Sequence, residues 1–238
     1  MDLQPRMSGA AVVIGASGGI GGAIAEALAE EGVFEIVHAF SRSFADEKHL
    51  DLEDEASIAA AAALVAKGPA PTLIIVATGL LHDGDLGPEK ALRDLDPIWL
   101  ARTFAVNAIG PALVAKHFLP LTAKGNRAVF AALSARVGSI TDNKLGGWYG
   151  YRAAKAALNQ LIRTIAIEEK RRNDRSIVVA LHPGTVDTDL SRPFQGRVTP
   201  GTLFTPDRAA MQLLDVIEDL KVTDSGKHFA WDGAEIAP

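Results

Sequence analysis

The fold is decided by a short apolar run that breaks into glycine, Ala10-Ala-Val-Val-Ile-Gly-Ala-Ser-Gly-Gly-Ile-Gly21. The run has the length and content of a strand buried on both faces, and residues 20–31 have the pattern of a helix. Glycines between a strand and a helix allow a tight turn, and they let backbone amides approach a pyrophosphate at the positive helix N-terminus. The stretch predicts a dinucleotide site, with a purely structural glycine-rich turn as the alternative. No Gly-Lys-Ser/Thr follows, which excludes a P-loop.

The rest of the chain alternates between strand-like and helix-like segments. The further strands are expected at 34–40, 72–77, 128–133 and 176–181, and the further helices at 55–67, 97–123, 149–172 and 206–220. Alternation of this kind requires right-handed crossovers and gives an α/β fold with a doubly wound parallel sheet. No linker interrupts the pattern, so we expect residues 1–238 to form one domain.

Composition excludes several classes of function. The formal charge is −5 and the basic residues are scattered, so nucleic acid is not an expected partner. There is no cysteine, and the six histidines never fall into an HExxH spacing, so we expect no metal site. The segment from Met1 to Ser8 is polar, and no apolar run approaches the roughly 20 residues that cross a bilayer. A cytoplasmic protein without a membrane segment is therefore expected.

A tyrosine and a lysine four residues apart open the fourth helical stretch, in Trp148-Tyr-Gly-Tyr-Arg-Ala-Ala-Lys155. Tyr151 and Lys155 lie on one face of a helix, whereas Tyr149 lies about 240° from Lys155 around the axis. A free tyrosine has a pKa near 10, and a nearby ammonium favours the phenolate. The spacing thus predicts a tyrosine tuned for proton transfer.

These motifs, in this order, resemble the short-chain dehydrogenase/reductase family, whose fold is a single Rossmann-type domain. The glycines at positions 15, 19 and 21 give its GxxxGxG pattern, although Gly15, Gly18 and Gly21 also fit the GxxGxxG of extended reductases and epimerases. The resemblance implies that Tyr151 is the catalytic acid–base group and that Lys155 also bonds the nicotinamide ribose. Only about 50 residues follow Thr188, so an extended-type epimerase with an added substrate domain ranks last.

The resemblance implies two further catalytic residues. In Phe130-Ala-Ala-Leu-Ser-Ala-Arg-Val-Gly-Ser-Ile140, the family's serine position, three residues before Gly138, holds Ala135. The hydroxyl that holds the substrate oxygen must then come from Ser134 or Ser139, and Ser134 is preferred because it keeps the strand-end location. Asn107, in Phe104-Ala-Val-Asn-Ala-Ile-Gly-Pro111, resembles the family asparagine that bends the helix and holds a water in the proton relay to lysine.

The choice of cofactor depends on the end of the second strand, Ala39-Phe-Ser-Arg-Ser43, which has no carboxylate before Asp46. An arginine in this place accommodates the 2′-phosphate of NADP, so NADP(H) is expected and NAD(H) is not preferred; Ser41 or Ser43 would add a hydrogen bond. Three more stretches resemble family motifs: His49-Leu-Asp-Leu52, Val76-Ala-Thr-Gly79 and Leu181-His-Pro-Gly-Thr-Val-Asp-Thr188. The residues expected at the cofactor are Gly15, Ser17, Gly18, Gly19, Ile20, Gly21, Ser41, Arg42, Asp51, Leu52, Ala77, Gly79, Tyr151, Lys155, Pro183, Gly184, Val186 and Thr188.

Residues 134–159 look like the subgroup that contains the C-factor signalling proteins and the sniffer-type carbonyl reductases. The implied activity is hydride transfer between NADP(H) and a small-molecule carbonyl or alcohol substrate. The alternative is a cell–cell signalling or cofactor-sensing protein that binds NAD(P)H with little turnover. The resemblance also implies a homodimer or homotetramer built on residues 97–123 and 149–172. The irregular segment 189–205 is expected to form a substrate lid.

Overall fold

A parallel sheet of six strands forms the centre of the structure, a computed structural model that describes residues 9–197, 199 and 201–238. The strand order is β2-β1-β3-β4-β5-β8. The strands are β1 (Ala10–Ile14), β2 (Ile36–Phe40), β3 (Pro71–Val76), β4 (Ala128–Leu133), β5 (Ser176–His182) and β8 (His228–Ala230). The order reverses at β1, where β2 lies on one side and β3 on the other. Ligands of open α/β sheets bind beyond the carboxyl ends of the strands at such a switch point.

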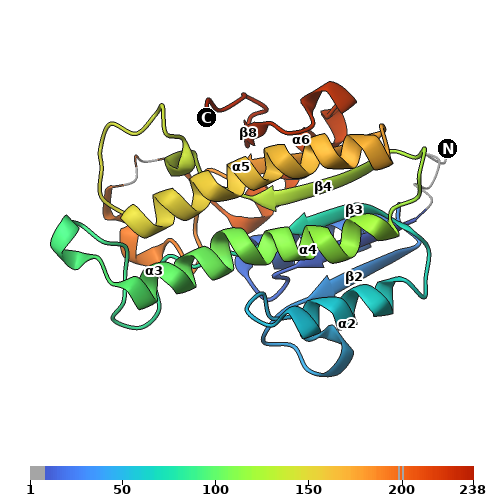
Figure 1. The fold of residues 1–238 in the computed structure, drawn as a ribbon, viewed down its shortest axis with the longest axis horizontal. Coiled ribbons are helices and arrows are strands. Elements are labelled where there is room, and N and C mark those ends of the chain that lie inside the picture. The colour runs from blue at the N-terminus through green and yellow to red at the C-terminus, as the bar shows by residue number, and fades with distance from the viewer. Residues whose placement is uncertain (1–8, 198, 200) are drawn as a thin grey trace.

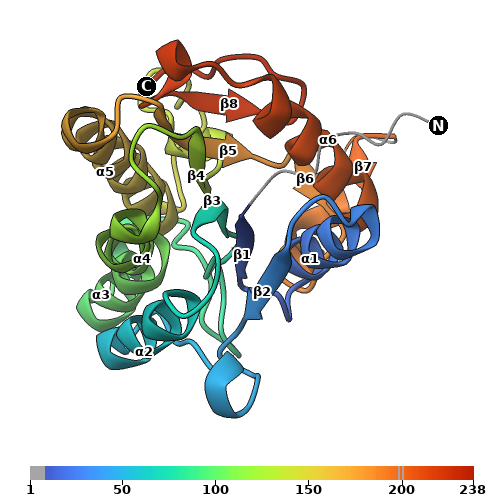
Figure 2. The same ribbon diagram turned by 90° about the vertical axis from the view of Figure 1, so that its right-hand side faces the viewer.

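Helices cover both faces of this sheet, which confirms the doubly wound α/β class (Figures 1 and 2). One face carries α1 (Gly19–Glu31) and α6 (Pro206–Asp219). The other face carries α2 (Glu55–Val65), α3 (Pro97–Phe104), α4 (Gly110–Phe118) and α5 (Tyr149–Arg172). The five strands and five helical stretches that the sequence predicts are all present within a few residues of their expected bounds. Gly32, in the left-handed conformation, ends α1.

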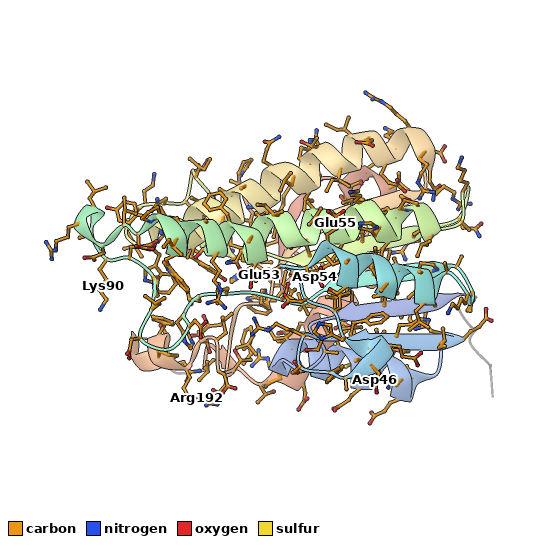
Figure 3. The ribbon with its side chains drawn as sticks, turned by 60° about the horizontal axis from the view of Figure 1, so that its bottom comes forward. Asp46, Glu53, Asp54, Glu55, Lys90 and Arg192 are labelled. Carbon is orange, nitrogen blue, oxygen red and sulfur yellow. The ribbon has the colours of Figure 1, made fainter. Side chains whose placement is uncertain are left out.

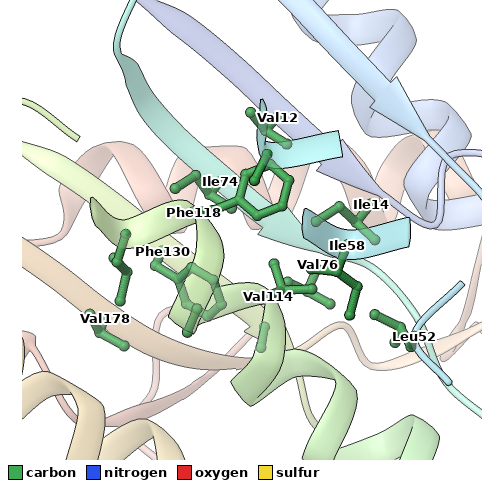
Figure 4. Packing of buried hydrophobic residues seen from close by; sticks show 14 of the residues in the cluster. Val12, Ile14, Leu52, Ile58, Ile74, Val76, Val114, Phe118, Phe130 and Val178 are labelled. Atoms are coloured by element: carbon green, nitrogen blue, oxygen red, sulfur yellow. The ribbon is translucent and has the colours of Figure 1, made fainter. Parts of the chain in front are cut away.

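The larger hydrophobic core lies between the sheet and the helices α2, α4 and α5 (Figure 4). Val12 and Ile74 lie beside Phe118 of α4, and Val178 lies beside Phe130 of β4. The rings of Phe40 and Phe118 lie 6.4 Å apart edge to face. Burying a side chain of this size stabilises the fold by roughly 1.5–3 kcal/mol. The continuous apolar strands are thus explained by burial on both faces, because a second core packs α1 and α6 on the opposite side.

The stretch 97–123 is not one regular helix. A π-helical segment, Ala105–Ile109, separates α3 from α4, and a 3-10 turn, Leu119–Leu121, ends the stretch. The side chain of Asn107 donates through Nδ2 to the carbonyl of Thr103 over 3.0 Å, which competes with the regular helical pattern. The resemblance predicted a bend at this asparagine, and the π-helical segment lies there.

The helical stretch Pro97–Leu121 is long and apolar. By length and composition alone this stretch could cross a membrane, so the expectation that no apolar run approaches that length is wrong. Its buried residues Val114 and Phe118 pack against the sheet, while Lys116 and His117 contact Glu55 of α2 at 2.6 and 2.9 Å. Packing in the core therefore accounts for its composition.

Three short elements differ from the sequence-based expectation. The segment from His49 to Leu52 resembles a short strand of the family, but here it forms only one isolated bridge, between Ser41 and His49. The edge strand β8 was not predicted, because three residues are too few to show a period. The same holds for the pair β6 (Thr185–Val186) and β7 (Leu203–Phe204).

Candidate active site

The N-terminus of α5 is fixed by contacts from a distant loop. Gly146, Gly147 and Trp148 all have positive φ values, and 54° at Trp148 is unusual for a bulky residue. Trp148 donates its N–H to the Glu89 carbonyl over 2.5 Å, and the Glu89 carboxyl group accepts the N–H of Gly150 over 3.0 Å. Glu89 thus takes the place of an N-cap residue for the helix that carries Tyr151 and Lys155.

Tyr151 and Lys155 line the same cleft, and the Lys155 Nζ lies 5.7 Å from the centre of the Tyr151 ring. The ammonium also donates to the carbonyl of Leu133, at the end of β4, over 2.8 Å. The two side chains therefore lie on one helix face and line one pocket. Tyr149 does not line this cleft.

The electrostatics of the pair differ from the simple expectation. Burial raises the pKa of Tyr151 to about 12 and lowers the pKa of Lys155 to about 7. The prediction that the ammonium favours the phenolate is therefore wrong for the protein alone, because desolvation outweighs the attraction between the two charges. The phenol is protonated at neutral pH, and the lysine titrates in the neutral range.

Two serines were candidates for the carbonyl-binding hydroxyl. Ser134 lines the cleft beside Tyr151, and its Oγ donates to Oδ1 of Asn159 over 2.7 Å. Ser139 is buried elsewhere, where its Oγ donates to the carbonyl of Pro238 over 3.2 Å and accepts the N–H of Asp142. Of these two serines, Ser134 is the one that lines the cleft with Tyr151, but its hydroxyl hydrogen is donated to Asn159.

Asn107 is completely buried and does not line the cleft. Its Oδ1 accepts the N–H of Leu80 over 3.0 Å, and its Nδ2 donates to the Leu80 carbonyl over 2.7 Å. Both polar groups of the Leu80 backbone are thus satisfied by one side chain. Asn107 fixes the segment after β3, which includes Gly79.

The turn between β1 and α1 has no room for side chains. Gly15 has a φ of 91°, and a Cβ atom there would lie 2.7 Å from the carbonyl oxygen of Ala77. At Gly21 an added Cβ would overlap the Gly15 carbonyl, so this glycine packs beneath the turn and does not line it. The N–H groups of Gly19, Ile20 and Gly21 find no backbone acceptor among the described residues.

These free amides suit a pyrophosphate at the start of α1. A second group that fits a polar ligand is the hydroxyl of Thr78, which is buried at the cleft without a hydrogen-bond partner among the described residues. Thr78 is not among the predicted site residues, because only the glycine of the family motif is preserved in Val76-Ala-Thr-Gly79. The donor set therefore fits a dinucleotide.

The far end of the cleft is rich in hydroxyl groups. The Oγ atoms of Ser17 and Ser41 lie 2.5 Å apart, and Ser43 donates its N–H to Ser41 Oγ over 3.3 Å. Arg42 and Asp51 line the same space. Arg102 of α3, which no sequence motif indicates, also lines it. Its side chain pairs with Asp83 at 2.5 Å and with Glu53 at 3.7 Å. Of these residues, Glu53 is labelled in Figure 3.

The model of the short chain dehydrogenases matches residues 9–197. The chain belongs to the short-chain dehydrogenase family.

Relatives of this family member span most of its length. It is 38% identical to the C-signal protein of Myxococcus xanthus over 146 residues, which are 61% of this chain and 82% of that protein. It is 30% identical to 1-hydroxy-2-glutathionyl-2-methyl-3-butene dehydrogenase of Rhodococcus sp. (strain AD45) over 230 residues, 93% of this chain and 96% of the relative. The predicted resemblance to the C-factor and sniffer-type subgroup is confirmed.

Solved structures agree with the fold. The NADPH-bound carbonyl reductase from chicken fatty liver superposes with a TM-score of 0.80 at 27% identity, covering 100% of this chain and 96% of that one. The carbonyl reductase Sniffer of D. melanogaster has a TM-score of 0.77 at 21% identity and covers 99% and 100% of the two chains, which shows a shared fold.

Most of the predicted site residues of this short-chain dehydrogenase line two adjoining spaces that share Ser17, Gly18, Ala77, Thr78 and Gly79, and we call the two together the long cleft. Those that line it are Gly15, Ser17, Gly18, Gly19, Ile20, Ser41, Arg42, Asp51, Leu52, Ala77, Gly79, Ser134, Tyr151, Lys155, Pro183 and Thr188. Gly184 and Val186 instead line an adjoining cavity of about 510 Å³, the apolar pocket, which also reaches Ser134 and Tyr151. His182 lines this pocket as well, and burial lowers its pKa to about 4, so its imidazole is neutral.

Proposed function

We propose that this protein is an NADP(H)-dependent oxidoreductase that moves a hydride between the nicotinamide and a small carbonyl or alcohol substrate. The observation that carries the proposal is that Tyr151 lines both the long cleft and the apolar pocket, with the Lys155 Nζ 5.7 Å from the centre of its ring. One space fits a dinucleotide and the other fits an organic substrate, and the proton donor lies at both. When bound, the cofactor supplies the hydride chemistry.

The order of the two pKa values suits carbonyl reduction. Tyr151, with a pKa of about 12, is a protonated phenol that can give its hydrogen to a carbonyl oxygen. Lys155, with a pKa of about 7, is the stronger acid, so proton transfer from its ammonium to a tyrosinate is favourable. We propose that Lys155 restores the phenol, that Ser134 polarises the substrate oxygen, and that Asn107 supports the relay by fixing Leu80.

For the cofactor we propose NADP(H). Arg42 and the hydroxyls of Ser17 and Ser41 line the end of the long cleft where a 2′-phosphate would bind, and the solved chicken carbonyl reductase holds NADPH. The Michaelis constants for NADPH and NADH test this directly. A Michaelis constant for NADPH at least tenfold below that for NADH supports the proposal, and a clear preference for NADH contradicts it.

The likeness to C-signal supports a second candidate, a signalling or cofactor-sensing protein that binds NAD(P)H with little turnover. The hydrogen bond that holds the Ser134 hydroxyl on Asn159 also favours this candidate, because it withdraws a donor from the substrate. A panel of aldehydes, ketones and diketones, followed by NADPH absorbance, separates the two. Sustained turnover supports the oxidoreductase; tight NADPH binding without turnover on any of them supports the sensor.

We further propose a homodimer or homotetramer that buries the outer faces of α4 and α5. Ile109 and Ile167 lie half-exposed on these helical stretches. A molar mass by light scattering near that of one chain would contradict the assembly.

The substrate lid remains a prediction. Leu190, Ser191 and Phe194 line the apolar pocket, while positions 198 and 200 of the predicted segment 189–205 lie outside the described residues.

A further inference from the structure

The apolar pocket has an aromatic wall next to the catalytic tyrosine. The ring of Trp148 lies edge to face with Phe194 at 5.2 Å and with Tyr151 at 6.3 Å. Leu81 and Leu145 add aliphatic surface to the lining. Aromatic and aliphatic walls of this kind bind a flat or branched apolar body, and they leave the polar carbonyl for Tyr151.

The charged side chains of this pocket are unbalanced. Three cations line it, Arg136, Lys144 and Arg152, against one carboxylate, Asp142. The lining thus carries an excess of two positive charges in a protein whose net formal charge is −5. A cationic lining in an acidic protein concentrates anions at the pocket.

The three cationic side chains differ in how many protein groups they already contact. Arg152 donates through Nε to the carbonyl of Gly147 and through Nη1 to that of Val137, both over 3.1 Å, which fixes its guanidinium. Arg136 pairs with Asp142 at 3.4 Å. Across residues 9–197, 199 and 201–238, Lys144 has neither a hydrogen bond nor an ion pair through its side chain, so its ammonium remains available.

We propose that the substrate of this pocket is an aromatic or branched apolar aldehyde or ketone that carries a carboxylate or another anionic group. The apolar body lies against Trp148 and Phe194, and the anion contacts Lys144 and the guanidinium of Arg152. This inference rests on the proposed oxidoreductase function, since it names the substrate class of the same site. His182 adds no charge, because its imidazole is neutral.

The test compares two aldehydes of nearly the same shape, 4-formylbenzoate and its neutral methyl ester, with NADPH as reductant. We expect wild type to favour the acid over the ester in kcat/KM by roughly five- to thirtyfold, since one or two partly exposed ion pairs give effects of this size. In Lys144→Glu this ratio should fall at least tenfold. The control Lys170→Glu makes the same charge change at the exposed end of α5 and should leave the ratio unchanged.

Raising the salt concentration from 0.05 to 0.5 M should reduce the same ratio, because exposed charges are screened. An equal kcat/KM for the acid and the ester in wild type, or equal effects of Lys144→Glu and Lys170→Glu, would overturn the inference while the proposed function stands.

Calorimetric binding of both aldehydes to Tyr151→Phe with NADP⁺ separates the two claims. If this variant binds the acid more tightly than the ester but wild type reduces neither, the anion preference holds and the proposed function fails. If neither aldehyde binds or reacts, the inference itself is overturned.

Discussion

Ser134 donates its hydroxyl hydrogen to Oδ1 of Asn159 across 2.7 Å, and Asn159 lies one helical turn beyond Lys155 on α5. A serine that polarises a carbonyl must turn this hydrogen toward the substrate. Giving up a neutral hydrogen bond costs about 0.5–1.5 kcal/mol, which is roughly a two- to twelvefold effect on rate. Asn159 therefore restrains the serine that the reaction needs.

We predict that Ser134 contributes to turnover and that Ser139 does not. Ser134→Ala should lower kcat by about 10²-fold, the usual effect of losing one donor to a developing oxyanion. Ser139→Ala should change kcat less than twofold, because its hydroxyl is bonded to Pro238. Asn159→Asp should slow turnover further by holding the Ser134 hydrogen with a charged acceptor. Steady-state kinetics on one carbonyl substrate checks all three, and an inactive Ser139→Ala beside an active Ser134→Ala would reverse the assignment.

Glu89 offers a test of how the catalytic helix is held. Glu89→Ala removes the acceptor of the Gly150 N–H at the start of α5, and we expect a loss of about 1–2 kcal/mol in the free energy of unfolding. For a chain of this size that corresponds to a fall in Tm of roughly 2–8 °C. Glu89→Gln keeps an oxygen acceptor and should lose less. Thermal unfolding is the measurement, with the exposed Glu30→Ala on α1 as control; identical Tm values for Glu89→Ala and Glu30→Ala would refute the capping role.

The lowered pKa of Lys155 predicts a pH-dependent stability for the protein without cofactor. The folded state loses the lysine proton near pH 7, whereas the unfolded chain keeps it up to its ordinary pKa of 10.5. Between these values the unfolded state binds more protons, so the free energy of unfolding rises with pH, by up to about 1.4 kcal/mol per unit for this group. Above pH 10 the raised pKa of Tyr151 acts in the opposite direction.

Lys155→Met removes this titration. Urea unfolding of the wild type and of Lys155→Met at several pH values from 7 to 9.5 should therefore show a steeper rise for the wild type. Parallel curves for the two proteins would show that the lysine is not desolvated in the folded state.

The sequence predicted those parts of the fold in which apolar residues form a continuous or periodic pattern, or in which two functional residues have a helical spacing. Long apolar strands and helices were found because burial on two faces leaves a continuous pattern, and Tyr151 and Lys155 were paired because four residues make about one helical turn. The strand β8 was missed, because three residues carry no period. The resemblance predicted a bend at Asn107, but the π-helical form of that bend was not predicted, because it depends on bonds from Asn107 to Leu80 and Thr103.

In the candidate site too, residues within local motifs were predicted, whereas residues from distant parts of the chain were not. Local motifs placed Arg42, Gly79 and Thr188 at the long cleft. Arg102 and Glu89 enter from loops and helices far away in the chain, and neither belongs to a motif. The direction of the Tyr151 pKa was predicted wrongly, because desolvation depends on how deeply the fold buries the ring and no spacing reports that.

The central claim is that the Tyr151 hydroxyl delivers the proton in carbonyl reduction. The most direct measurement is the single-turnover oxidation of NADPH by Tyr151→Phe beside Tyr149→Phe, which removes the only other tyrosine hydroxyl of the chain. We predict that Tyr151→Phe binds NADPH with wild-type affinity but reduces the carbonyl at least 10²-fold more slowly, while Tyr149→Phe keeps the wild-type rate. A wild-type rate in Tyr151→Phe would contradict the account.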